Sequence, residues 1–313
     1  MIEMKPLLRT IALGAAALIT CMLAAQQEVM VSQYMFNGLF LNPAYAGSHG
    51  YTSSSLLHRT QWLHMEGAPS TSMAAVDGSI MHGKMGLGLS IVHDRIGVSR
   101  DMDVAGQYAY HLKLSEQSRL SFGLRAGFSL YSARLSDLTY WDASDQVFQN
   151  DINDRPVGKF GFGIYWYDAT SFIGISAPTL HALDKQIRLE RSSLGDRYFK
   201  QHFYLQAGKV YPLGEFFDVK PSVMVKYLPN TPIEADVNCN FLYRERFWFG
   251  GGYRTGDAFI WMLEYQVDRQ VRIGYAYDMT TTRLRNYSSG SHEIMIGVDF
   301  GRETIKIKTP RYF

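Results

Sequence analysis

The chain has 313 residues and a formal charge of +2, with 46% hydrophobic and 19% charged residues. This near-neutral balance gives no reason to expect nucleic acid as a partner. No internal apolar run reaches the roughly 18 residues that a membrane-spanning helix needs, which argues against a helical membrane protein.

Residues 1–25 have the pattern of a secretory signal peptide. Lys5 and Arg9 form a positive n-region, and residues 11–25 form an apolar h-region. We expect cleavage after Ala25; a lipoprotein signal ending at Cys21 and a buried N-terminal helix are the alternatives. Cleavage leaves Cys239 as the single cysteine of the mature chain, so no internal disulfide can form.

Residues 26–49 show no clear period and are too apolar for a disordered tail. The pairs Asn42-Pro43 and Ala46-Gly47 are turn signals. We predict that this segment packs inside or under the following domain as a small plug.

Strand patterns fill the chain after residue 49. Most of these segments span about nine to thirteen residues, the length of a tilted strand that crosses a bilayer. We predict about 14 strands, an even number as in bacterial single-chain barrels. The segments lie near 50–62, 70–81, 84–94, 101–114, 119–131, 158–168, 170–177, 199–211, 216–228, 232–243, 246–254, 257–267, 270–279 and 290–301.

Alternation is strictest in the last three segments. In residues 259–267 one parity carries large apolar and aromatic side chains such as Trp261 and Leu263, and the other carries Ile260, Met262 and Glu264. A period of two puts each set on its own face of a sheet. A soluble sandwich would bury the larger apolar face, whereas a transmembrane barrel would turn it to lipid.

The connections favour the barrel. Links near 81–84, 115–118, 168–170, 212–215, 243–246 and 267–270 are tight, and the interleaved links include the long ones at 132–157, 178–198 and 280–289. Short periplasmic turns and longer extracellular loops alternate in this way in an up-and-down barrel. We therefore predict an all-β fold, a transmembrane antiparallel β-barrel over residues 50–301, followed by a basic periplasmic tail at 302–313.

Side chains of the two faces have different expected roles. Aromatic girdles at the membrane interfaces would place Trp141, Trp166, Trp248 and Trp261. Arginine at Trp261, Leu263 or Ile273 should destabilise the barrel, whereas serine at Gly274 or Ala276 should be tolerated. The predicted lumen charges form a shape-holding network rather than a transport site; they are Arg125, Arg254, Glu264, Arg272, Asp278, Glu293 and Asp299.

Catalytic signatures are missing from the sequence: it has no G-x-S-x-G, no H-E-x-x-H, no paired C-x-x-C and no P-loop. The nine histidines match no metal spacing. His93-Asp94 is the only suggestive pair for a barrel enzyme. We therefore expect a protein that is not an enzyme and needs no cofactor or metal.

Several motifs recur along the chain: an Asn-Pro-Ala-Tyr-Ala-Gly run, an Arg-Thr-Gln-Trp run and three C-terminal runs. Their residues are Asn42, Pro43, Ala44, Tyr45, Gly47, Arg59, Gln61, Trp62, Gly67, Pro69, Arg254, Gly256, Asp257, Tyr275, Tyr277, Asp278, His292 and Glu293. These motifs resemble the PorP/SprF family of outer-membrane proteins of the type IX secretion system of Bacteroidetes. The resemblance covers nearly all of the mature chain and is densest in the three C-terminal runs.

The resemblance implies a role in the outer membrane, surrounded by its lipid. Members of this family support export or surface attachment of proteins with a C-terminal sorting domain, in some cases gliding adhesins. Implied partners are such a secreted client and periplasmic ring or peptidoglycan-linked components of the machine. The alternative is an outer-membrane porin or transporter for a small solute. Residues 142–156 and 178–198 depart from the family pattern and are where client specificity could lie.

Overall fold

A computed structural model describes residues 29–138, 151–183, 201–229 and 231–301 of the chain. The predicted signal peptide at 1–25, the predicted tail at 302–313 and Trp141 lie outside these ranges, as do most residues of the two divergent loops. No helix within the described ranges is long and apolar enough to cross a membrane.

Strands make up nearly all of the described chain. Short 3-10 helices precede the first strand (η1 Tyr34–Phe36, η2 Gly38–Phe40, η3 Pro43–Tyr45) or occupy connections (η4 Met81–Gly83, η5 Leu135–Asp137, η7 Arg283–Asn286). The strands are β1 Thr52–Thr60, β2 Ser70–Ile80, β3 Met85–Ile96, β4 Ser99–Lys113, β5 Arg119–Ala133, β6 Ile152–Tyr167, β7 Ser171–Leu183, β8 Phe203–Lys209, β9 Tyr211–Leu213, β10 Phe217–Tyr227, β11 Glu234–Tyr243, β12 Phe247–Arg254, β13 Ala258–Gln266, β14 Val271–Thr280 and β15 Ser291–Phe300.

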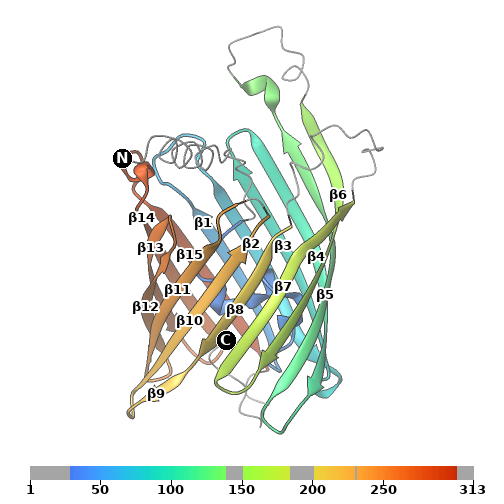
Figure 1. Cartoon of the computed structure of the whole chain (residues 1–313), viewed down its shortest axis with the longest axis vertical. Coiled ribbons are helices and arrows are strands. Elements are labelled where there is room, and N and C mark those ends of the chain that lie inside the picture. The colour runs from blue at the N-terminus through green and yellow to red at the C-terminus, as the bar shows by residue number, and fades with distance from the viewer. Residues whose placement is uncertain (1–28, 139–150, 184–200, 230, 302–313) are drawn as a thin grey trace, which may run out of the picture.

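The strands close into an antiparallel barrel. Strands β8 and β9 both pair with β10 on either side of Val210, so they form one interrupted strand and the barrel has the 14 strands predicted. Closure comes from β1 pairing with β15 and from β10 pairing with β11 (Figure 1). A closed barrel leaves no unpaired edge, as spanning a bilayer with strands requires.

Side-chain alternation follows the predicted parity. Trp261 is 60% exposed on the outer face of β13, whereas its neighbour Met262 is 2% exposed inside the barrel. The same division holds for β14 and β15, where Ile273 and Ile294 face outward and Glu293 faces inward. One prediction is wrong: Trp248 is buried inside the barrel against Phe36, with ring centroids 6.2 Å apart, and belongs to no outer girdle.

All links at one end of the barrel are short, and the long connections lie at the other end, together with the short links between β3 and β4 and between β12 and β13 (Figure 1). We call these the turn end and the loop end. The largest differences from the predicted boundaries are in β6, which begins at Ile152, and β7, which continues to Leu183. Residues 152 and 155–160 of β6 pair with β5, which extends β6 toward the loop end. Residues 158–160 of β6 also pair with residues 181–183, which extends β7 in the same direction.

Candidate functional site inside the barrel

The N-terminal segment, residues 29–50, lies inside the barrel (Figure 1). It begins near the loop end, beside the ends of β14 and β15, and reaches the turn end, where β1 starts. Asn37 and Asn42 cap its second and third 3-10 helices by accepting hydrogen bonds from the backbone N–H groups of Leu39 and Ala44. Whether the segment also closes the lumen to solutes stays a prediction.

Apolar side chains of the N-terminal segment pack on the inner wall. Tyr34, Met35 and Phe36 belong to one buried cluster with Trp248 and Met262 of the wall. This cluster explains why the inward-facing positions of β12 and β13 include large apolar residues such as Trp248 and Met262 as well as charged residues. The burial of these side chains from water favours the inserted position of the segment.

Inward-facing glycines form the seat of the Asn42–Gly47 motif. Gly123 of β5 and Gly163 of β6 are register partners, and a Cβ at either position would collide with residues 42–44. A Cβ at Gly86 of β3 would likewise collide with the carbonyl of Ala46. Asn42 also donates a 3.0 Å hydrogen bond to the Ile164 carbonyl. The inserted backbone approaches Gly86 and Gly123 closely, and the Asn42 side chain approaches Gly163 closely, so these wall positions require glycine.

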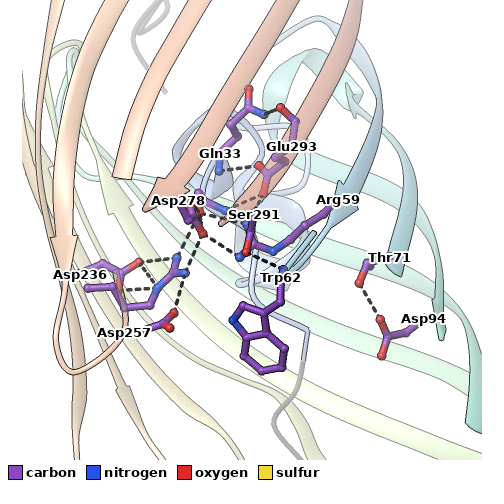
Figure 2. Close-up of polar contacts among 12 residues, drawn as sticks. Gln33, Arg59, Trp62, Thr71, Asp94, Asp236, Asp257, Asp278, Ser291 and Glu293 are labelled. Carbon is purple, nitrogen blue, oxygen red and sulfur yellow. Dashed lines mark hydrogen bonds and ion pairs between the residues drawn. The ribbon is translucent and has the colours of Figure 1, made fainter. Parts of the chain in front are cut away.

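A buried charge cluster holds the start of the N-terminal segment at the loop end (Figure 2). Glu293 accepts hydrogen bonds of 2.8 Å from the backbone N–H groups of both Ser32 and Gln33. Arg59 bridges two acids, with its Nη2 2.7 Å from Asp278 Oδ2 and its Nη1 3.2 Å from Glu293 Oε2. The Ser32 hydroxyl donates to Asp278 at 2.7 Å.

Arg254 extends this cluster across β11, β12 and β14. Its guanidinium lies 3.0 Å from Asp236 and 3.3 Å from Asp278, and Asp257 follows at 3.5 Å. Asp278 therefore joins both arginines. A buried pair needs such additional hydrogen bonds to offset the loss of hydration, and the backbone of the N-terminal segment supplies part of them.

Two further groups of charges lie elsewhere in the lumen. Near the turn end Arg272 Nη1 is 2.6 Å from Asp299 Oδ1, and Ser53 donates to the same carboxylate. On the opposite wall Arg125 pairs with Asp103, which also lies 3.0 Å from Lys159. Glu264 is buried in β13. All seven predicted lumen charges thus face the interior, and they belong to separate groups.

Several inward charges were not in the predicted set. They are Arg59, Asp77, Asp103, Lys159, Lys220, Lys226 and Asp236. Strand parity could have found them, since Lys220, Ser222, Met224 and Lys226 alternate with apolar residues along β10. Asp77 accepts a 2.7 Å hydrogen bond from the backbone N–H of Gly47, and strand parity could not predict this contact because it depends on the inserted segment.

The remaining motif residues lie outside the lumen. Gln61, Trp62, Gly67 and Pro69 belong to the connection between β1 and β2, and Gly256 turns the chain between β12 and β13 with a φ of +71°. On the outer face the Tyr275 hydroxyl lies 2.8 Å from His292 Nδ1, beside Tyr277. The family-motif residues therefore lie in three places: the inserted segment, the buried charge cluster that holds it, and the connections and outer face outside the lumen.

His93 and Asp94 lie on opposite faces of β3. Asp94 accepts a 2.6 Å hydrogen bond from Thr71 (Figure 2), whereas His93 is exposed on the outer face. The two side chains cannot act on one substrate. In the described part of the chain no group of three His, Cys, Asp or Glu residues could hold a metal ion.

The similarity to known proteins identifies the family. Residues 23–298 match the family described as type IX secretion system membrane protein PorP/SprF. The chain belongs to the PorP/SprF family. No curated protein is a match. A closed barrel with an apolar outer face in a family of secretion-system membrane proteins lies in the outer membrane.

Solved outer-membrane proteins resemble this PorP/SprF family member only distantly. Omp33 of Acinetobacter baumannii is 7% identical at a TM-score of 0.46, covering 80% of this chain and 100% of its own. The toluene transporter TbuX of Ralstonia pickettii is 10% identical at a TM-score of 0.49, covering 83% and 92%. The KdgM porin is 10% identical at a TM-score of 0.38, covering 80% and 98%.

Proposed function

We propose that the protein is a barrel component of the type IX secretion system that supports export or surface attachment of sorting-domain proteins. Gliding adhesins are one class of such clients. In this role the loop end meets the client and the turn end meets periplasmic ring or peptidoglycan-linked parts of the machine. The role is structural, and the protein catalyses no reaction.

The observation that carries this proposal is the family match over residues 23–298. The lumen supports it: the N-terminal segment inside the barrel is tied to the wall by Glu293, Asp278 and Asp77. A barrel that keeps its own chain inside is suited to anchoring and contact. The turn end offers charged side chains to a periplasmic partner, among them Arg244, which lies over the ring of Phe216 at 5.0 Å.

Deletion of the gene in its host, followed by a census of proteins on the cell surface, tests the proposal. We expect a defined set of sorting-domain proteins to disappear from the surface and to return when the intact gene is restored. An unchanged surface would contradict the proposed role. A non-enzymatic role further predicts that His93→Ala restores export as well as the intact gene does.

Transport of a small solute is the competing function. Planar-bilayer recordings of the refolded protein distinguish the two, since a large, steady, solute-selective current would favour a porin. We expect no such current from the intact chain. Recovery of a sorting-domain client or a periplasmic ring component with the detergent-solubilised protein would instead support the secretion role.

A further inference from the structure

A pocket of about 260 Å³ opens at the loop end, beneath the connection between β1 and β2. Neighbouring residues of β1, β2 and β3 form the wall of the pocket, and the connection between β1 and β2 forms its roof. The residues used below are Thr60, Ser70 and Arg95 of the strands and Trp62, His64 and Met65 of the connection.

Strand register places this pocket on the outer wall. The outward-facing residues of β1 to β4 form rows across the sheet, and the row at the pocket is Thr60, Ser70, Arg95 and Arg100. One step toward the membrane the row is His58, Ser72, His93 and Met102, and the next is Leu56, Ala74, Ile91 and Val104. The wall therefore changes from cationic to apolar over two steps, the profile of a surface that passes from lipid headgroups into hydrocarbon.

The two arginines of the first row have no partner within the described residues. Arg95 and Arg100 are register partners on β3 and β4, and both are exposed. Neither side chain forms an ion pair or hydrogen bond with another described residue. Glu66, the acidic residue of the connection between β1 and β2, does not line the pocket. A pair of free guanidinium groups offers the planar donor fork that binds phosphate oxygens.

The roof of the pocket is held in place from both sides. Trp62 and His64 adopt left-handed backbone conformations with φ of +48° and +73°, which non-glycine residues keep only where the surroundings fix them. Leu63 exchanges backbone hydrogen bonds of 2.8 and 3.0 Å with residues 289–290. On the other side Gly97 donates a 2.9 Å bond to Gly67.

The aromatic ring of Trp62 is directed away from the buried charge cluster. Figure 2 shows the indole pointing away from Asp278 and Glu293, while the backbone N–H of Trp62 donates a 3.2 Å hydrogen bond to the Ser291 hydroxyl. Trp62 and Met65 thus give the pocket apolar surface beside the guanidinium of Arg95. A ligand with a phosphate group attached to a partly apolar skeleton would match both the guanidinium of Arg95 and the apolar surface beside it.

We infer that this pocket, together with Arg100 beside it on β4, binds the phosphate-bearing headgroup of a glycolipid of the outer leaflet. Arg95 and Arg100 contact the phosphate, and Trp62 and Met65 contact the carbon skeleton next to it. The position at the border between the cationic row and the apolar rows selects a membrane lipid over a soluble anion. This inference concerns the outer wall and is independent of the proposed role in secretion.

Native mass spectrometry of the full-length, delipidated protein in detergent tests the inference, with bisphosphorylated lipid A as the probe. We expect Arg95→Gln combined with Arg100→Gln to weaken lipid A binding about tenfold or more, because charge-assisted hydrogen bonds are lost. Arg246→Gln is the matched control, since Arg246 is an exposed cation in the connection between β11 and β12 at the turn end. It should leave binding unchanged.

Three results would overturn the inference. They are wild-type binding by the double variant, equal binding of fully dephosphorylated lipid A, and displacement of lipid A by an equal concentration of inorganic phosphate. The last result would indicate a site for a free anion. Unboiled gel mobility, which distinguishes folded from unfolded barrels, confirms beforehand that the double variant folds.

Discussion

Glu293 shows how one buried side chain joins the N-terminal segment to the barrel wall. It accepts two backbone hydrogen bonds from residues 32 and 33 and pairs with Arg59. Its side chain is fully buried, at 0% exposure. A carboxylate in this position is stable only while all of these partners stay in place.

Glu293→Gln should therefore destabilise the folded barrel by about 3–5 kcal/mol, the cost of breaking a buried ion pair. The new amide would keep one acceptor oxygen, but its NH2 group would face the other of the two backbone N–H groups from which Glu293 now accepts. Urea unfolding of the protein in phospholipid vesicles, followed by tryptophan fluorescence, measures this change.

Asp257→Asn is the control for this measurement. Asp257 lies 3.5 Å from Arg254 but is 31% exposed, so its loss should cost about 1 kcal/mol or less. Equal effects of the two substitutions would show that Glu293 does not anchor the segment.

At the scale of elements, the inserted segment depends on the glycines of the neighbouring strands. Gly123→Ala would place a Cβ against the backbone of Pro43 and Ala44. Overpacking of this kind costs about 1–3 kcal/mol, so cleavage of residues 29–50 by added protease should become roughly tenfold faster. Mass spectrometry of the products locates the cuts.

Gly106→Ala provides the matched control for Gly123→Ala. Gly106 lies on the outer face of β4, and the nearest atom to its added Cβ is the Ala126 carbonyl oxygen at 3.9 Å. This substitution should leave cleavage unchanged and can stabilise the strand slightly, since alanine costs less backbone entropy than glycine. If residues 29–50 resist protease equally in both variants, the claim that Gly123 makes room for the inserted segment is wrong.

The turn between β13 and β14 has a charge-dependent contribution to stability. Asp268 Oδ1 accepts backbone hydrogen bonds from Gln270 at 2.7 Å and from Val271 at 2.8 Å. The N–H groups of Val271 and Gln270 lower the pKa of Asp268 below its ordinary 3.8. A lowered pKa stabilises the fold above pH 3.8, and this contribution disappears as the pH falls through the lowered value.

Asp268→Asn should therefore lower the urea midpoint of unfolding at pH 7. The difference between the variant and the wild type should shrink once the pH falls below the folded-state pKa, because a protonated aspartate is neutral like asparagine. Urea titrations at a series of pH values give the comparison. A difference that stays constant with pH would mean that the charge of Asp268 contributes nothing.

Particular elements show what the sequence could and could not predict. Period-two alternation marks most of the strands, most strictly β13, β14 and β15, so strand number and facing were predictable. The path of residues 29–50 was not, because contacts such as Asn42 with Ile164 join positions far apart in the chain. The expected tolerance of serine at Gly274 stays a prediction, but the sequence did not indicate that a Cβ there would require the side-chain amide of the inserted Gln33 to move.

The barrel has two surfaces of opposite chemical character, a charged inner surface and an apolar outer surface. The lumen buries paired charges around the N-terminal segment, and the outer wall exposes large apolar side chains such as Trp261 and Leu263. In water such a wall would favour aggregation, whereas in a bilayer it matches the surrounding hydrocarbon. The depth of a residue in the membrane should therefore decide how costly a charge is.

Leu263→Arg tests this dependence on depth. Leu263 is exposed on the outer face in the interior of β13, whereas Val267 is exposed just beyond the end of that strand at the turn end. Arginine near the bilayer midplane costs about 2–4 kcal/mol and near an interface about 0–1 kcal/mol. Leu263→Arg should lower the free energy of unfolding by the first amount and Val267→Arg by the second, measured by urea titration in vesicles. Both variants add the same side chain to one outward-facing run of the chain, so equal losses would mean that the middle of the outer wall does not contact hydrocarbon.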